Sequence, residues 1–242
     1  MIKNLPDAIQ EIVEDIQAES VSSRSFTATS TSLTCNYTTG NNIFIEGMYV
    51  EIPTQYDNIR WEIQTLVKNS AESFTLTLSG DFSAVIGLEQ PLVLRPFIKF
   101  KYDSYKNVQK RLVEESKGTT EKKNKYPLLI LQVPYKEERD RASGIIFETN
   151  ANFALIVDCR KTWTTAQRHE YSFKQKLHPL YDLFIEKLKL SDLFRYDENI
   201  CIPHGKEDIY HWSSDEAKTQ NKLAAVVDAI EITNLNLILN KN

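Results

Sequence analysis

The stretch VVDAIEITNLNLIL, residues 226–239, alternates between apolar and polar side chains over most of its length. This alternation predicts a β-strand that must be buried on one face. Its apolar residues include Ile230, Ile232, Leu235, Leu237 and Leu239. Asp228 is a charge inside an otherwise apolar run. Because a buried unpaired carboxylate is costly, it either lies in solvent at the start of the strand or pairs with a basic group. The strand needs a sheet to receive it.

Two earlier runs are candidates for the rest of that sheet. YPLLILQV (126–133) and NFALIVDC (152–159) are short and continuously apolar, which suits strands covered on both faces. SGIIFE (143–148) is a possible intervening strand. The charged stretches GTTEKKNK (118–125) and KEERDRAS (136–143) are predicted to be exposed loops.

Three segments show helical spacing of apolar residues. Residues 4–18 form the first, with Asn4 as its cap and Pro6 in the first turn. A second helix is expected from helical spacing over residues 102–113, and Gly118 can end it. The strongest pattern covers residues 173–191, where Pro179 either kinks the helix or marks its first turn.

Between the first two helices the chain is rich in short strand patterns. Ser and Thr dominate residues 21–42, and strand-like runs follow at 43–52, 59–67 and 73–78. This order predicts an α+β protein. Residues 1–20 and 97–242 are expected to form an α/β sandwich, and residues 21–96 an inserted antiparallel β-rich segment or small barrel.

Composition excludes several classes of protein. None of the apolar runs in the 242 residues approaches the roughly 18 that a membrane helix needs, and the acidic N-terminus does not resemble a signal peptide. The seven glycines do not cluster as in a nucleotide-binding loop. Residues 1–95 carry 5 basic and 12 acidic side chains, and the remainder carries 24 and 21. This asymmetry permits self-association through unlike charges.

Candidate catalytic residues are few. His169, His178, His204 and His211 lack the spacing of a metal-binding motif, so no metal or other cofactor is expected. Cys159 precedes Arg160 and Lys161, which could lower its pKa, but no catalytic signature surrounds it. Cys35 and Cys201 are interpreted, like Cys159, as small buried apolar residues.

Two basic stretches contain aromatic residues, at 99–111 and 160–176. Such stretches can bind nucleic acid, but a solvated helix face and a long loop are the favoured interpretation, and subunit contacts are the main alternative.

The order of the segments resembles that of the tail-terminator or tail-completion proteins and the head–tail neck ring proteins of tailed bacteriophages. The matching pieces are the N-terminal helix, YPLLIL (126–131), NFALIVDC (152–159), RHEYSFKQKLHPLYDLFIEKL (168–188) and the final strand with its Asp-Ala-Ile start. The resemblance covers residues 1–20 and about 97–239. The segment 21–96 departs from the compact family pattern.

The resemblance implies a virion protein without catalytic activity, made in the host cytoplasm. Such proteins form six- or twelvefold homo-oligomeric rings beside other neck, tail, portal or adaptor proteins, and DNA passes through their channel. Candidate subunit-contact or channel-facing residues are Lys122, Lys123, Lys125, Arg139, Arg141, Arg160, Lys161, Arg168 and Asp228. The alternatives are a nucleic-acid-binding module and, less favoured, an enzyme with a dispersed Cys/His site.

Overall fold

The structure, a computed structural model, divides the chain into two compact units. One comprises Met1–Ile16 with Lys99–Asn242, and the other comprises Gln17–Ile98. These boundaries lie within a few residues of those expected from the sequence. The residues described are 4–38, 43–53, 59–70, 73–83, 92–104, 107, 125–139, 147–195, 202–210 and 226–239.

The smaller unit is a closed antiparallel barrel. Its strands follow the order β1-β2-β5-β4-β3-β6 around the barrel. They span β1 (Val21–Ala28), β2 (Ser32–Thr38), β3 (Tyr49–Glu51), β4 (Trp61–Lys68), β5 (Ser73–Ser79) and β6 (Val93–Pro96). Alternate residues of β2 and β5 are buried, and the Tyr37 and Phe74 rings stack with centroids 5.5 Å apart. The predicted small barrel is therefore confirmed.

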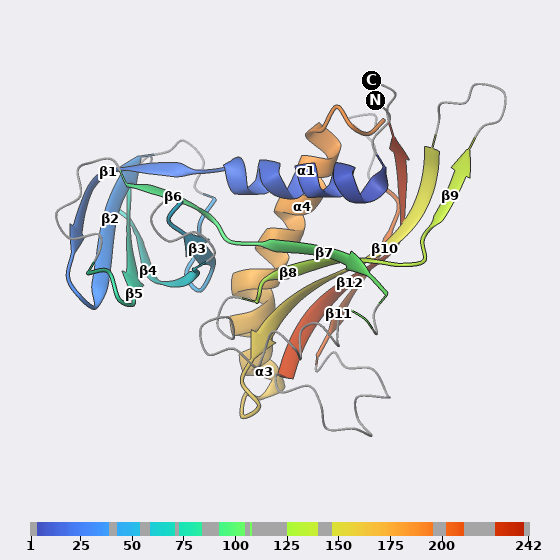
Figure 1. The fold of residues 1–242 in the computed structure, drawn as a ribbon. Helices are drawn as coiled ribbons and strands as arrows, with labels where there is room; N and C mark the ends of the chain where they lie inside the picture. Colours follow the sequence, from blue (N-terminus) through green and yellow to red (C-terminus); the bar gives the residue numbers. More distant parts are fainter. Residues whose placement is uncertain are drawn as a thin grey trace. The chain divides into compact units, whose positions relative to one another are not determined.

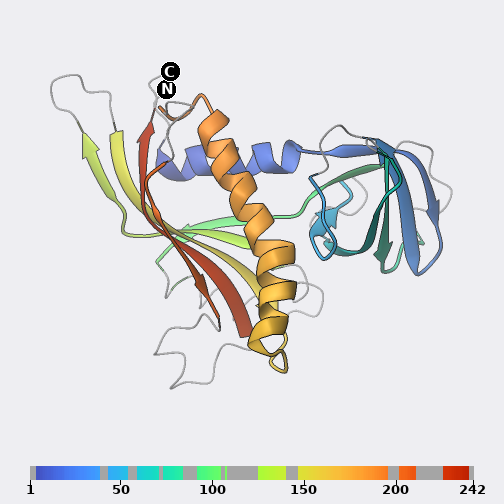
Figure 2. The same ribbon diagram turned by 180° about the vertical axis from the view of Figure 1, so that it is seen from behind.

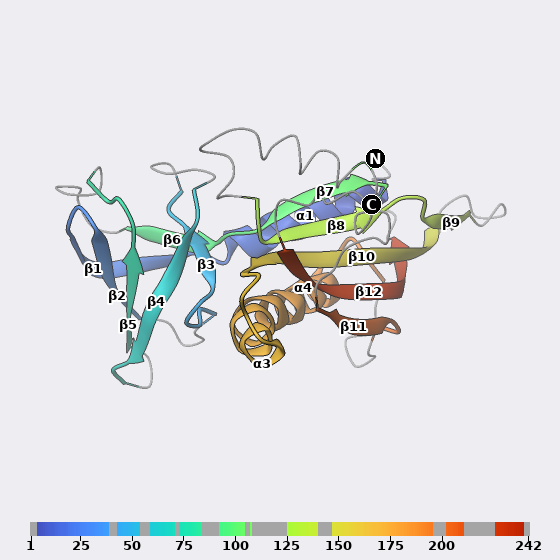
Figure 3. The same ribbon diagram turned by 90° about the horizontal axis from the view of Figure 1, so that it is seen from below.

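The larger unit is built on one mixed sheet. Its strand order is β11-β12-β10-β8-β7, with β9 paired to β10 beside this path, as Figure 3 shows. The strands are β7 (Lys99–Asp103), β8 (Leu128–Gln132), β9 (Lys136–Arg139), β10 (Phe147–Cys159), β11 (Gly205–Ile209) and β12 (Val226–Leu239). β10 and β12 pair from Phe147↔Leu239 to Cys159↔Val226, so the final segment is a central strand.

Both faces of this sheet are apolar at its centre. Phe153 and Leu155 of β10 lie on one face. The Phe153 ring packs against that of Phe184 of the long helix, with ring centroids 5.6 Å apart. The opposite face buries Tyr126, Leu128, Ile130, Ala154, Ile156, Val227 and Ala229. Two-sided burial explains why the runs at 126–133 and 152–159 are continuously apolar instead of alternating.

The helices of the larger unit follow the predicted amphipathic patterns. α1 (Leu5–Ala18) buries its apolar stripe, and the side chain of Asn4 accepts a 2.9 Å hydrogen bond from the amide of Asp7. The long helix consists of α3 (Thr165–Arg168), a π-helix η1 (His169–Leu177) and α4 (His178–Leu190), and it runs along one face of the sheet (Figures 1 and 2).

Pro179 lies where the π-helical turns end. The amide of His178 donates to the carbonyl of Phe173, five residues earlier, and Pro179 then occupies the first turn of α4. Proline has no amide to donate, and its ring collides with the carbonyl four residues earlier in a regular helix. The wider π-helical turn gives that ring space, so the helix continues through the proline.

Three sequence expectations need correction. Tyr102, expected in a helix, lies in β7, and most of the remaining expected helix (residues 105, 106 and 108–118) is outside the described residues. Residues 136–139 form β9 instead of a loop, because they extend the sheet along β10. The final part of 143–148 is the beginning of β10 and not a separate strand.

We predict that a chain ending at Ala225 is insoluble or lacks cooperative unfolding. Without β12, β10 loses its longest partner and β11 loses the strand to which it pairs. Circular dichroism with thermal unfolding is the measurement. A chain ending at Leu239 is the matched control and should unfold like the full-length protein. A folded, soluble chain ending at Ala225 would contradict the central role of β12.

Candidate functional site

The start of the long helix positions a buried cation. Thr164 caps α3: its side chain accepts from the amide of Gln167 at 3.3 Å, and Gln167 Oε1 accepts from the amide of Thr164 at 2.9 Å. This capping box fixes the first helical turn. Arg168 is the last residue of α3, and only 1% of its side chain is exposed.

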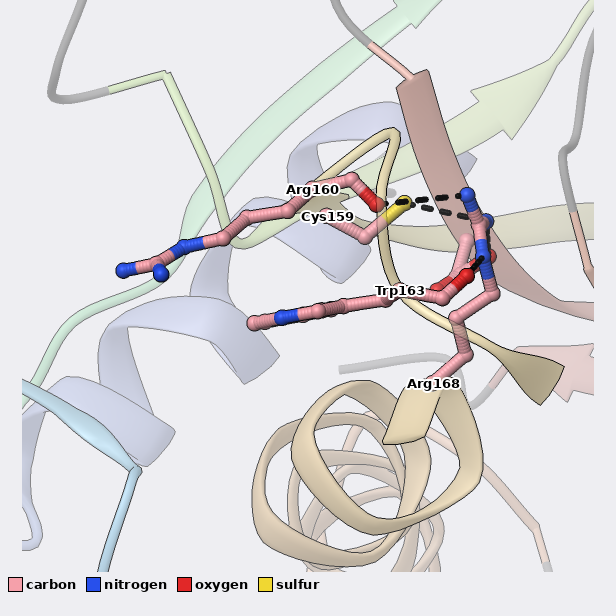
Figure 4. A network of polar contacts seen from close by, with 5 residues as sticks. Cys159, Arg160, Trp163 and Arg168 are labelled. Carbon is pink, nitrogen blue, oxygen red and sulfur yellow. Dashed lines mark hydrogen bonds and ion pairs between the residues drawn. The ribbon is translucent and has the colours of Figure 1, made fainter. Parts of the chain in front are cut away.

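The Arg168 guanidinium joins four segments of the chain (Figure 4). One terminal nitrogen donates to Asp228 Oδ1 of β12 at 2.7 Å and to Cys159 Sγ at the end of β10 at 3.1 Å. Nε donates to the carbonyl of Trp163 at 3.4 Å, and the other terminal nitrogen donates to the carbonyl of Arg160 at 3.5 Å. The guanidinium therefore ties the helix start to β10, to β12 and to the turn between β10 and the helix.

The charge of Asp228, which interrupts an apolar run of the sequence, is paired in the structure. Its side chain is fully buried and pairs with Arg168, which confirms the second of the two alternatives. The pair is shielded from solvent, so its Coulomb attraction is strong, but both ions also lose their hydration. Such a pair fixes geometry more than it adds stability, whereas the loss of either partner alone is severe.

Cys159 is unsuited to nucleophilic chemistry in this environment. Burial and the neighbouring Asp228 carboxylate raise the pKa of its thiol to about 12, against the opposing effect of Arg168. The neutral thiol hydrogen-bonds to Asp228. Because the thiolate is the reactive form, this geometry argues against activation of the thiol by Arg160 and Lys161, the alternative that the sequence left open but did not favour.

A second polar cluster joins the long helix to β11. His178 Nε2 lies 2.8 Å from Asp208 Oδ2, and Lys206 Nζ lies 3.2 Å from Asp208 Oδ1. Burial raises the pKa of the Asp208 carboxyl, but the hydrogen bonds and charges of His178 and Lys206 outweigh it and lower that pKa overall. These contacts fix the position of β11 against the helix.

Two tyrosine–histidine contacts extend this cluster. Tyr181 Oη and His204 Nε2 are 2.6 Å apart, and His204 Nδ1 donates to the carbonyl of Ile202 at 2.6 Å. His169 Nδ1 is 3.3 Å from Tyr210 Oη. In the neutral form of His204, the Ile202 contact leaves Nε2 as an acceptor, so Tyr181 donates to it. The cluster is thus a hydrogen-bonded bridge between elements.

The spacing of the histidines in the sequence does not predict this cluster, because the segment between them is a π-helix. His169 and His178 are nine residues apart, which in a regular α-helix at about 100° per residue places them on opposite sides. The wider π-helical turns make nine residues span about two turns, so the two rings share a face with centroids 6.1 Å apart. Within the described residues, no three His, Cys, Asp or Glu side chains are grouped to hold a metal ion.

The residues predicted as contact or channel residues fall into three groups. Arg160 and Lys161 are exposed on the turn after β10. Lys125, Arg168 and Asp228 are buried instead of lying on the expected surface, the last two because they pair with each other. Arg139 lies in β9, in a part where side chains are not described, and Lys122, Lys123 and Arg141 lie outside the described residues.

The second basic stretch does not form one continuous cationic surface. Arg168 and Lys176 are buried, and Lys174 forms an ion pair with Glu170 at 3.1 Å. Arg160 lies over the Trp163 ring at 5.8 Å, and Trp163 packs against Tyr171. The charges of residues 160–176 are therefore divided between interior pairing and surface exposure. The capping box at Thr164–Gln167 was the available signal that the helix begins there.

Comparison with known proteins gives no assignment: no family model, curated protein or solved structure matches this chain. Among the described helices, none combines the length and the apolar character required to cross a membrane.

We predict that Arg168→Met lowers the free energy of unfolding by roughly 3–5 kcal/mol, because it leaves the Asp228 carboxylate buried without its cation. Urea unfolding measures the change. The double variant Arg168→Met/Asp228→Val should lose much less than the sum of the two single variants, since no buried charge remains. Additive losses would contradict the pairing.

We also predict that Cys159 resists alkylation at neutral pH. With a thiol pKa of about 12, its thiolate fraction near pH 8 is on the order of 10⁻⁴. Labelling with iodoacetamide followed by peptide mass mapping should show slow modification that accelerates about tenfold per pH unit until the protein unfolds. An unstructured cysteine peptide is the control. Labelling of Cys159 at the rate of that peptide would contradict the proposed environment.

Proposed function

We propose that this protein is a non-enzymatic structural subunit of a tailed-bacteriophage virion. In this proposal it forms a ring in the head–tail neck, or at the end of the tail, around the DNA channel. The segment order, which resembles that of this family, supports the proposal. The polar cluster around Arg168 supports it as well. Arg168, Asp228 and Cys159 bind one another in the interior and present no reactive group.

The two edge strands of the sheet are the structural feature that best supports the proposal. β7 and β11 end the sheet, and in the described part of the chain neither has a further strand beside it. Open edges present backbone donors and acceptors to other chains, and natural proteins cover or disfavour them unless association is their purpose. Two open edges on one sheet suit head-to-tail association of identical subunits, which produces closed rings when the rotation matches.

A nucleic-acid-binding module is less well supported. Of the basic side chains in residues 160–176, Arg168 and Lys176 are withdrawn into the interior. The proposed role needs DNA only as a passing ligand, and a weakly charged channel wall suits that because tight phosphate contacts would hold the DNA. The net charge of −4 agrees with it.

The assembly role predicts oligomers far larger than the 27.9 kDa chain. Light scattering and negative-stain microscopy of the purified full-length protein should show closed rings, either alone or after addition of purified phage neck or tail particles. Electrophoretic mobility of duplex DNA in dilute salt provides the comparison for the alternative function. A chain that stays monomeric, joins no particle and binds DNA with a steep salt dependence would replace the assembly role with the nucleic-acid one.

A further inference from the structure

β7 is an edge strand of the sheet that the described strands form. β7 runs parallel to β8, and the ladder is bounded by bonds from the Lys99 amide to the Pro127 carbonyl and from the Val133 amide to the Asp103 carbonyl. Backbone groups of a strand alternate in direction, so those of Lys99, Lys101 and Asp103 face β8. Those of Phe100 and Tyr102 face away from the sheet.

β7 also carries an exposed aromatic side chain. Tyr102 is 57% exposed, and its ring lies 6.4 Å from that of Phe100. Large exposed aromatics are enriched at the centres of protein–protein interfaces. A strand at the edge of the described sheet that carries an exposed tyrosine is thus suited to pairing with another strand.

The opposite edge of the sheet has matching dimensions and opposite charge. β11 has five residues, as β7 does, and Gly205, Lys206 and Glu207 are exposed. Glu207 pairs in register with Glu231, which places two acidic residues opposite each other. A basic residue beside Glu207 would form a favourable cross-strand pair with it.

The lysines of β7 project from the same face of the sheet as Glu207. Lys99 and Lys101 are in register with Leu128 and Ile130, which belong to the face that also contains Ala154 and Ala229. Glu231 is in register with Ala154, so Glu207 lies on that face as well. If the sheet continued from β7 of one copy into β11 of the next, Lys99 and Lys101 would lie beside Glu207.

The strand directions are compatible with this continuation. β11, β12, β10 and β8 are successively antiparallel, and β7 is parallel to β8, so β7 and β11 run in opposite directions. In a ring whose strands follow the symmetry axis, β7 of one subunit and β11 of its neighbour would form an antiparallel pair. Antiparallel pairing is slightly more stable per residue than parallel pairing.

We propose that β7 and β11 are the two complementary halves of a heterologous subunit interface. β7 of each copy adds to β11 of the next, and Lys99 and Lys101 lie against Glu207. This inference rests on the proposed assembly function and names the surface through which the ring closes. The partner is a second copy of this chain, since both the equal strand lengths and the opposite charges are supplied by the chain itself.

Charge reversal tests the pairing. Lys101→Glu and Glu207→Lys should each convert the rings to subunits of 27.9 kDa, because each variant then has edges of like charge. When the two variants are mixed, every β7 again meets a β11 of opposite charge. Native mass spectrometry should then show rings that contain the two chains in equal numbers. The double variant Lys101→Glu/Glu207→Lys should form rings alone.

A backbone test complements the charge test. Tyr102→Pro removes an outward amide without removing a bond to β8, so the subunit should remain folded while ring formation is lost. Tyr102→Thr is the matched control, because it removes the aromatic ring but retains the amide. It should retain more ring formation than Tyr102→Pro does. Circular dichroism checks that each variant is folded. If Tyr102→Pro does not fold, Glu207→Lys, a change at an exposed site, tests the interface in its place.

The outcomes separate the two proposals. If the wild-type protein forms rings and all these variants form them too, the β7–β11 interface is overturned and the assembly function stands. Mixed variants that form only dimers would overturn it in favour of β7 pairing with β7 about a twofold axis. A wild-type chain that binds neck particles only as a monomer, and loses that binding through Tyr102→Pro, would assign the edge to another protein. A wild-type chain that neither self-associates nor binds particles would overturn both proposals.

Discussion

The buried ion pair between Arg168 and Asp228 is the constraint around which the larger unit is organised. A buried charge is costly unless it is paired. The long helix must therefore begin where the Arg168 guanidinium can reach Asp228 of β12. The same group binds the carbonyls of Arg160 and Trp163, and this fixes the connection from β10 to the helix. Apolar contacts alone would permit small shifts of the helix along the sheet, whereas directional hydrogen bonds do not.

The π-helix that follows has a second effect on the molecule. It lets the chain pass through Pro179 without ending the helix, and it rotates His169 and His178 onto one side. From that side His178 reaches Asp208, and Tyr181 reaches His204, so the helix holds β11 in place. These side chains thereby stabilise β11, the short strand at the edge of the described sheet.

These features favour a structural role over a catalytic one for the described polar residues. The cysteine beside the ion pair is kept in its neutral form by burial and a carboxylate. The histidines contact tyrosines, an aspartate and a backbone carbonyl within the fold. The two edge strands of the described sheet differ in charge: β7 carries lysines and an exposed tyrosine, and β11 carries the exposed Glu207. A ring built from such edges would bury both in every subunit.

The sequence by itself determined those elements whose signal is local. Periodicity predicted α1, the core of the long helix and the strands β8, β10 and β12, because hydrophobic spacing reflects burial directly. It also indicated that Asp228 needs a solvent position or a cation, but many basic residues were available and spacing does not select among them. Only the tertiary structure paired it with Arg168, made β12 central, and brought His178 to Asp208 through a helix of altered period. These outcomes depend on which distant segments pack together, and that is decided by the whole set of contacts.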